Sequence, residues 1–157
     1  MARTPPRESP PSTTGSEKAD RAPAGARSVL FLESCFALHS LDIRFLQGLD
    51  ALGAHPADIR AAIGPGIGAC CFEVGPEVVA AAEALLHEPL GALVRPRADG
   101  KALLNLKGVN ARRLAQLGVP AEQIAVSDAC TMCRPDVFWS HRATDGRRGV
   151  QAAVITL

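Results

Sequence analysis

The chain has 157 residues, of which 47% are hydrophobic and 21% charged, so that it suffices for one modest core. Its net charge of +1 and its low aromatic content, 4%, argue against a nucleic-acid polymer as partner, because they provide neither a basic field nor a base-stacking surface. Five unevenly clustered cysteines do not resemble a secreted disulfide framework and indicate a reducing, cytoplasmic location.

The amino-terminal part divides into a leader and two apolar segments. Residues 1–28 contain five prolines and few large apolar side chains, so a disordered leader is expected there. Val29–Leu38 predicts a strand or a collapsed segment, and it falls short of the ~20 apolar residues of a membrane span, so no membrane partner is expected. Ser40 is typical of a helix N-cap, and apolar side chains recur on one side of the chain from there to Gly53.

The middle of the chain predicts a strand, two helices and a tight turn. Ile59–Ile63 is aliphatic and bounded by proline and glycine, as a buried strand would be. A helix is predicted from Pro76 to just before Pro89, and a second one over 104–117, where apolar residues recur every three or four positions. Between them, Arg95–Gly100 has an Asp-Gly tip and predicts a turn that joins two pairing segments.

Three short apolar segments towards the end predict strands, at 124–126, 137–140 and 150–157. Strands and helices therefore interleave along the chain, but without the regular alternation typical of a doubly wound sheet. The predicted class is α/β, with a layered mixed sheet and flanking helices.

A glycine-rich loop follows the strand predicted at 59–63. It reads Gly64-Pro65-Gly66-Ile67-Gly68-Ala69-Cys70-Cys71, and it lacks the Lys-Ser or Lys-Thr pair of a phosphate-binding P-loop. Glycines can adopt positive φ or admit a close neighbour, so the segment predicts a shaped loop. The simplest interpretation is a tight corner with two buried cysteines.

Cys130 and Cys133 have the spacing of a zinc knuckle or of a redox pair. With Cys70 and Cys71 they could supply four thiolates to a structural metal ion. Against this, adjacent cysteines tend to point in different directions, and Pro135 follows where a redox pair would open a helix. The favoured expectation is that no metal is bound here, and the four-thiolate site is the alternative.

Polar side chains also gather at Ser140-His141-Arg142, shortly before two further arginines. Guanidinium groups suit phosphate or carboxylate, while the alternative is a solvated basic loop. The other histidines, His39, His55 and His87, have no second ligand at helical spacing and are expected at the surface or at helix ends.

Three separated segments, Ile63–Gly75, Asn105–Asn110 and Cys130–Arg142, carry a resemblance to one family. From about Ile43 to the end, the chain resembles the polyphenol oxidase, or laccase-domain, family (YfiH-like), now regarded as purine nucleoside phosphorylases. The motifs occur in the same order, which makes the resemblance more specific than any one of them.

The resemblance implies an α/β fold akin to the catalytic domain of cytotoxic necrotizing factor. It also implies a zinc-dependent active site, which older descriptions assigned to copper. The implied reactions are the cleavage of adenosine, inosine, guanosine and methylthioadenosine by phosphate, and the deamination of adenosine. Arg142 is the candidate phosphate ligand, and Ser140, Gly66 and Gly68 are the accompanying candidates for binding substrate and phosphate. No catalytic residue is assigned.

The chain departs from the family pattern at the metal site. The family's metal ligands are a His in Val-His-Gly, a Cys in Ala-Asp-Cys and a His in His-Ala-Gly-Trp-Arg-Gly, and none of these motifs occurs here. Residues 29–157 are therefore expected to form a partial domain, the carboxy-terminal half, which does not retain the ion alone. Asn105, Ala143 and Val150 also replace an Asp and two Arg that are common in the family.

Three interpretations follow. The chain is an active phosphorylase completed by a partner chain, an inactive truncated fragment, or a small cysteine-metal module. A partial domain would expose an apolar sheet face, so self-association is expected as well.

Overall fold

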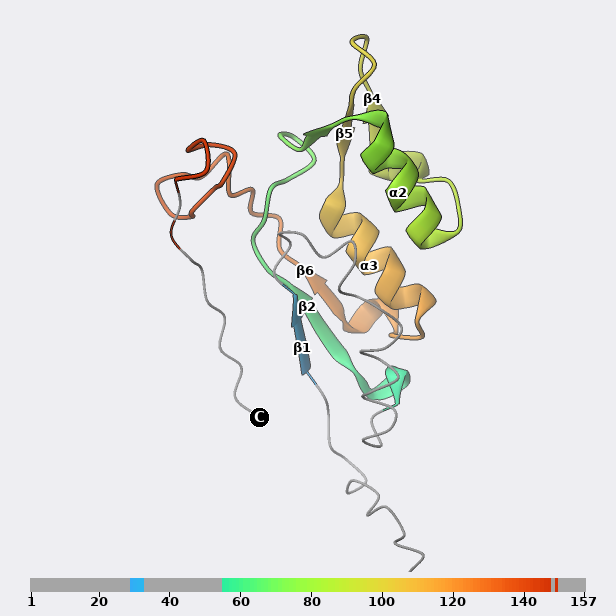
Figure 1. Cartoon of the computed structure of the whole chain (residues 1–157). Helices are drawn as coiled ribbons and strands as arrows, with labels where there is room; N and C mark the ends of the chain where they lie inside the picture. Colours follow the sequence, from blue (N-terminus) through green and yellow to red (C-terminus); the bar gives the residue numbers. More distant parts are fainter. Residues whose placement is uncertain (1–28, 33–54, 148, 150–157) are drawn as a thin grey trace, which may run out of the picture.

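The computed structural model describes residues 29–32, 55–147 and 149 (Figure 1). The leader at 1–28, the helix predicted from Ser40 to Gly53 and the strand predicted at 150–157 lie outside the described residues.

A parallel sheet forms one part of the fold. Its strands are β1 (Val29–Leu32), β2 (Arg60–Ile63) and β6 (Ile124–Val126), in the order β1-β2-β6. Single-turn 3-10 helices precede the last two strands, η1 (Pro56–Asp58) before β2 and η3 (Ala121–Gln123) before β6. The strands predicted at 59–63 and 124–126 are thus confirmed, as is a strand within 29–38.

Helix α3 (Leu106–Gln116) packs against β2 and β6 (Figure 1). It begins after Asn105, whose side-chain oxygen accepts a hydrogen bond from the N–H of Gly108 and so satisfies one of the unpaired donors of the first turn. Its Leu114 joins one core cluster, with Ile59, Ala61, Ile63 and Val119. Burial of apolar surface in this cluster holds the helix on the sheet.

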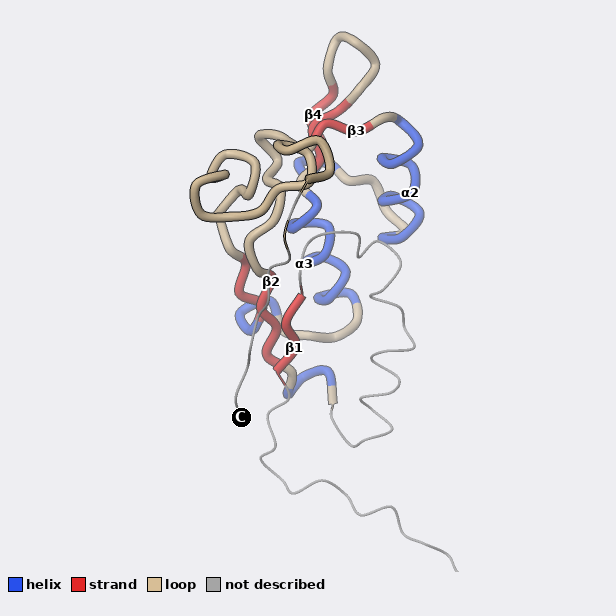
Figure 2. The backbone as a smooth tube through the Cα atoms, turned by 60° about the vertical axis from the view of Figure 1, so that its left-hand side comes forward, coloured by secondary structure: helices blue, strands red, loops and turns tan. Residues whose placement is uncertain are grey.

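A second, antiparallel sheet lies at the other end of α3 (Figure 2). It consists of β3 (Glu73–Val74), β5 (Ala102–Leu104) and β4 (Val94–Pro96), in the order β3-β5-β4, and the single turn η2 (Gly91–Leu93) leads into β4. The predicted turn between β4 and β5 is confirmed, since the N–H of Arg97 donates to the carbonyl of Lys101 at 2.8 Å. Gly100 adopts φ +78° at its tip, where a side chain would be strained.

Helix α2 (Pro76–Leu86) covers this second sheet and contacts α3. A second core cluster forms here from Val74, Ala82, Leu86, Leu90, Leu104 and Val109. Because Val109 belongs to α3, this helix contributes to both clusters. The two α-helices have 11 residues each, and among the described residues no helix has the length and apolarity to span a bilayer.

The fold class is confirmed as mixed α/β, but the strand predicted at 137–140 is wrong. Backbone N–H groups of Val137 and Phe138 both donate to the carbonyl of Arg134, at 3.1 and 2.9 Å, and wrap the chain into turns. Pro135 has no N–H to offer a neighbouring strand. Val137 and Trp139 consequently remain exposed.

Replacing Leu114 with alanine tests the role of α3. Leu114 is 0% exposed, so Leu114→Ala is expected to lower the free energy of unfolding by about 2–5 kcal/mol through lost burial and a cavity. Val137→Ala, at an exposed position, serves as control and should change it by less than about 0.5 kcal/mol. Urea unfolding followed by circular dichroism measures both, and equal effects would contradict this account of the core.

Candidate functional site

The loops that follow β2 and β6 lie side by side, because these two strands are parallel and in register. Ile63 is paired with Val126, and an isolated parallel bridge joins Gly66 to Cys130 beyond the strand ends. The N–H of Thr131 donates to the carbonyl of Gly66 at 3.1 Å. The glycine loop and the Cys130–Cys133 segment thus meet at the carboxyl edge of the sheet, where open α/β sheets bind their ligands.

The meeting of these loops brings four cysteines together. Cys70, Cys71, Cys130 and Cys133, here termed the thiol cluster, have all their sulfur atoms within 4.8 Å of one another. The Cys133 sulfur lies 3.6 Å from that of Cys70 and 3.5 Å from that of Cys71. The expectation that adjacent cysteines diverge is wrong here, because residues 68–72 form a turn in which the N–H groups of Cys71 and Phe72 both donate to the carbonyl of Gly68.

The burial of the cluster also differs from the expectation. Cys130 is buried, but Cys70 and Cys133 are exposed and Cys71 is half-buried. The interpretation of a corner with two buried cysteines, Cys70 and Cys71, is therefore wrong. All four cysteines are free thiols, and three of the four residues are exposed or half-buried.

Burial and hydrogen bonds shift the pKa values of three of these thiols, Cys71, Cys130 and Cys133, in different directions. Burial raises the pKa of Cys71 far above its ordinary value, and contacts with the other thiols raise it further. Burial also acts to raise the pKa of Cys130, but hydrogen-bond donors, first the N–H groups of Gly68 and Cys133, outweigh it and lower that pKa to about 6. At Cys133, the contact with Cys71 lowers the pKa, while those with the other two thiols outweigh it and raise the pKa. Of Cys71, Cys130 and Cys133, Cys130 is thus the thiol whose pKa is lowered.

Gly68 allows the two loops to approach closely. A Cβ at Gly68 would lie 3.1 Å from Cβ of Cys130 and 3.2 Å from Sγ of Cys70, and the N–H of Gly68 donates to Sγ of Cys130 at 3.2 Å. The loop glycines were expected either to adopt a positive φ or to admit a close neighbour. Gly68 does not have a positive φ, and its lack of a side chain admits the close neighbour. Gly66 and Gly68, both candidates for binding substrate, are therefore engaged with the Cys130–Cys133 segment.

A hollow of about 470 Å³ opens beside the cluster, between the glycine loop, the start of α3 and the end of β6. Residues that line it include Gly68, Asn105, Lys107, Ser127 and Asp128. Sequence reasoning missed Lys107, which is only 5% exposed and whose ammonium group donates to the carbonyls of Ser127 and Ala129. Its signal was a lysine on the buried face of a helix, three residues before Asn110 and seven before Leu114.

Arg142 lies against the chain that leaves the glycine loop. Its Nη1 donates to the carbonyl of Glu73 at 2.6 Å, and its guanidinium lies over the ring of Phe72, 5.4 Å from the centroid. The carboxylate of Glu73 is itself paired with Lys101 at 2.7 Å and with Arg97 at 3.3 Å. Arg142 is thus held in place by a backbone oxygen and an aromatic face.

Ser140 has a local structural contact. It is 5% exposed, its hydroxyl oxygen accepts from the N–H of Ala143 at 3.3 Å, and its carbonyl accepts from the hydroxyl of Thr144 at 2.9 Å. These bonds form the turn that carries Arg142. The histidines His55 and His87 are at helix ends as expected, while His39 lies outside the described residues.

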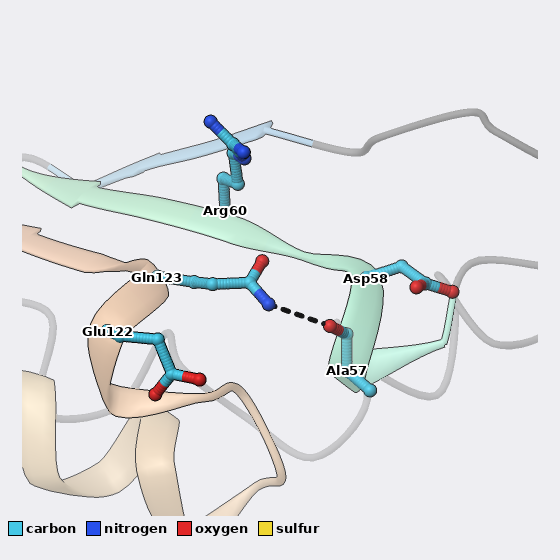
Figure 3. A pocket seen from close by; sticks show the side chains of 5 residues that line it. All are labelled: Ala57, Asp58, Arg60, Glu122 and Gln123. Atoms are coloured by element: carbon cyan, nitrogen blue, oxygen red, sulfur yellow. Dashed lines mark hydrogen bonds between the residues drawn. The ribbon is translucent and has the colours of Figure 1, made fainter.

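A second hollow, of about 420 Å³, lies at the opposite, amino edge of the parallel sheet (Figure 3). Ala57, Asp58, Arg60, Glu122 and Gln123 line it. Gln123 donates to the carbonyl of Ala57 at 2.9 Å, and this bond ties the single turns before β2 and β6 together. The lining of this second hollow includes none of the residues expected to bind substrate and phosphate, which are Gly66, Gly68, Ser140 and Arg142.

Comparison with known proteins decides the family. The profile of the family described as multi-copper polyphenol oxidoreductase laccase matches residues 44–157. The chain belongs to this family. The resemblance carried by the glycine loop, the start of α3 and the Cys130–Arg142 segment is thereby confirmed.

Relatives in this laccase family include phosphorylases and a deaminase by name. The purine nucleoside phosphorylase YlmD of Geobacillus stearothermophilus is 39% identical over 100 residues, which are 64% of this chain and 36% of that protein. The adenosine deaminase RL5, from an unknown prokaryotic organism, is 41% identical over 90 residues, which are 57% of this chain and 34% of that protein. This chain thus spans about a third of the length of these relatives.

Solved structures of the laccase family share the fold. The crystal structure of YlmD from Geobacillus stearothermophilus matches with a TM-score of 0.63 and 36% identity, covering 68% of this chain and 40% of that one. The Bacillus licheniformis hypothetical protein YfiH also gives 0.63 at 36% identity, over 66% of this chain and 39% of that one. The described residues therefore form part of the fold of these proteins.

The residues described here do not fit the metal site that the laccase family implies. That site combines two histidines with a cysteine, in sequence contexts that this chain lacks. Within the described part of the chain, the metal-ligating side chains that gather in one place are the four thiols, with no histidine among them. The described residues therefore do not assemble a ligand set of two histidines and one cysteine.

Lys107 is expected to fix the position of the chain that follows β6. Lys107→Met removes both hydrogen bonds and leaves the Ser127 and Ala129 carbonyls without this donor, so it should lower the free energy of unfolding by about 1–3 kcal/mol. Lys101→Met provides the matched control, because it removes a surface ion pair with Glu73 and should have a much smaller effect. Urea unfolding compares the two, and a larger loss at Lys101 would contradict the assigned role.

Proposed function

We propose that this chain binds a purine nucleoside together with phosphate and serves the phosphorolysis of that nucleoside. In this reaction a phosphate oxygen forms a bond to the anomeric carbon of the ribose as the bond to the purine breaks, and the purine leaves with the electron pair and a proton. Membership of the laccase family supports this, together with relatives named purine nucleoside phosphorylase at 39% identity. The substrates proposed from the resemblance are adenosine, inosine, guanosine and methylthioadenosine, with adenosine deamination as a second activity supported by the name of RL5.

Arg142 is the proposed phosphate ligand. A guanidinium has five N–H donors, and one of those of Arg142 is bonded to the carbonyl of Glu73, while the Phe72 ring supports its face. The side chain is exposed, so its other donors remain accessible to an anion. A guanidinium held in this way loses little conformational freedom when it binds phosphate, which favours binding. Ser140 contributes by forming the turn that carries Arg142.

The hollow beside the thiol cluster is the proposed place of the nucleoside. Its volume, about 470 Å³, is within the range of small-molecule sites, and it lies at the carboxyl edge of a parallel sheet. Gly68 lines it and Gly66 supports the neighbouring loop, while Asn105, Lys107 and Asp128 add polar groups. Nucleosides need both apolar surface and a few polar contacts, and this hollow offers both.

The described residues are assigned binding rather than metal chemistry. A catalytic zinc ion of the family type would need histidine ligands from polypeptide outside the described residues, either in a partner chain or in a longer form of this one. The free thiols support a cytoplasmic location. The exposed side chains of Val126, Val137 and Trp139 support self-association.

Equilibrium binding of inosine and phosphate to the whole chain tests the proposal. Calorimetry is expected to show saturable binding of inosine, and of phosphate in the presence of inosine. Arg142→Gln should weaken phosphate binding about 10-fold, the effect of losing one charge-assisted hydrogen bond, and leave inosine binding unchanged. Arg147→Gln is the matched control in the same loop and should leave both affinities unchanged.

Each outcome decides for or against the proposal. Phosphate-dependent release of hypoxanthine from inosine would support it directly. Absence of both binding and turnover would overturn it in favour of an inactive protein that retains part of the fold. Equal weakening by Arg142→Gln and Arg147→Gln would show a general charge effect and remove Arg142 from the site.

A further inference from the structure

The geometry points to a structural zinc site in which the four sulfurs of Cys70, Cys71, Cys130 and Cys133 coordinate one Zn²⁺ ion. This inference depends only on the thiol cluster and not on the proposed nucleoside chemistry. The favoured expectation from the sequence, no metal at these cysteines, assumed that Cys70 and Cys71 diverge, which they do not.

The distances agree with a tetrahedral ion. Zinc binds thiolate sulfur at about 2.3 Å, so four sulfurs around one ion lie about 3.8 Å from one another. In the cluster, Cys133 is 3.6 Å from Cys70 and 3.5 Å from Cys71, and no two sulfurs are more than 4.8 Å apart. The widest pair therefore has to close by at most about 1 Å, from 4.8 to 3.8 Å, which side-chain rotation in the two loops can supply, since Cys70 and Cys133 are exposed.

The same distances do not correspond to disulfides. A disulfide bond is about 2.05 Å long, whereas the Cys133 sulfur lies 3.6 Å from that of Cys70 and 3.5 Å from that of Cys71, and all four thiols are free. When the four thiols bind the ion, they lose their protons and become four negative thiolates. The ion compensates two of these charges, so the complete site carries a charge of about −2. Nearby positive and donor groups are then required.

One donor contacts the sulfur of Cys130, and one cation is bonded to the residue before it. The N–H of Gly68 donates to its sulfur at 3.2 Å, and the ammonium group of Lys107 donates to the carbonyl of the preceding residue, Ala129, at 3.0 Å. Lys107 and Gly68 both line the hollow that Cys70 and Cys130 also line. Hydrogen bonds of this kind around the ligands of a metal orient them and stabilise their charge.

The proposed ion would join the loops after β2 and β6. Two ligands come from each loop, and the sequence separation between Cys70 and Cys133 is 63 residues. Four protein ligands leave no open position for water or substrate, so the ion holds the carboxyl edge of the sheet together and takes no part in a reaction. Thiolate ligands in a tetrahedral arrangement select zinc or iron over harder ions, and zinc is chosen here because it is the usual ion of structural sites.

Metal content of the whole chain tests this inference. The chain is purified in the absence of oxygen and chelator, its affinity tag is removed, and zinc is measured by mass spectrometry. One zinc ion per chain is expected. Cys71→Ser and Cys133→Ser should each lower the zinc affinity by more than ~10- to 100-fold, which is the cost of losing a group that only hydrogen-bonds to a metal ligand. Competition with a chromophoric chelator measures this affinity.

Cys35→Ser is the matched control, because it makes the same substitution at the fifth cysteine. It should retain one zinc ion, and equal loss of zinc in this variant would overturn the four-thiol assignment.

Cobalt substitution of the unmodified chain avoids any variant that fails to fold. Co²⁺ in the cluster should show intense thiolate charge-transfer bands and the visible bands of a tetrahedral complex, and X-ray absorption of the zinc form should show four sulfurs at about 2.3 Å. A chain that binds no zinc when reduced, binds iron in its place, or shows nitrogen or oxygen in the first shell would overturn the inference.

Discussion

The parallel pairing of β2 with β6 is the constraint on which the candidate site depends. Ile63 lies opposite Val126, and this register places the glycine loop beside the Cys130–Cys133 segment. The register is in turn fixed by burial, because Ala61 and Ile63 point their side chains into the core under α3, and a slip of one residue would turn them to the other face. A packing preference several residues away thus determines the distances among four sulfurs.

Helix α3 connects this sheet to the rest of the protein. Leu114 belongs to the core under the parallel sheet and Val109 to the core under the antiparallel one, while Lys107, near the start of the helix, holds the chain after β6. Asn110 lies on the same buried face, 0% exposed, and neither polar atom of its amide has a hydrogen-bond partner in the described part of the chain. Nε of Arg113, on the same helix, is also buried without a partner, and unpaired buried polar groups of this kind cost free energy.

Local features of the fold were predictable from the sequence, and contacts between distant segments were not. Periodicity and end signals predicted α2 and α3 to within about two residues, and the Asp-Gly tip predicted the hairpin of β4 and β5. The thiol cluster was named from the sequence only as the less favoured alternative, because its assembly depends on a parallel pairing between strands about 60 residues apart that no local pattern encodes. The strand predicted at 137–140 was wrong since apolar content alone does not show that the preceding residues, including Pro135, form turns. The resemblance to the laccase family was recognisable because it rests on motifs rather than contacts.

The hairpin of β4 and β5 extends away from both cores (Figure 1). At its tip, Gly100 has φ +78° and open space where a Cβ would be, and the ion pairs of Arg97 and Lys101 with Glu73 hold the residues on either side of the turn. The tip is therefore suited to carry a foreign peptide, such as an epitope or a fluorophore acceptor, without disturbing the carboxyl edge of the parallel sheet.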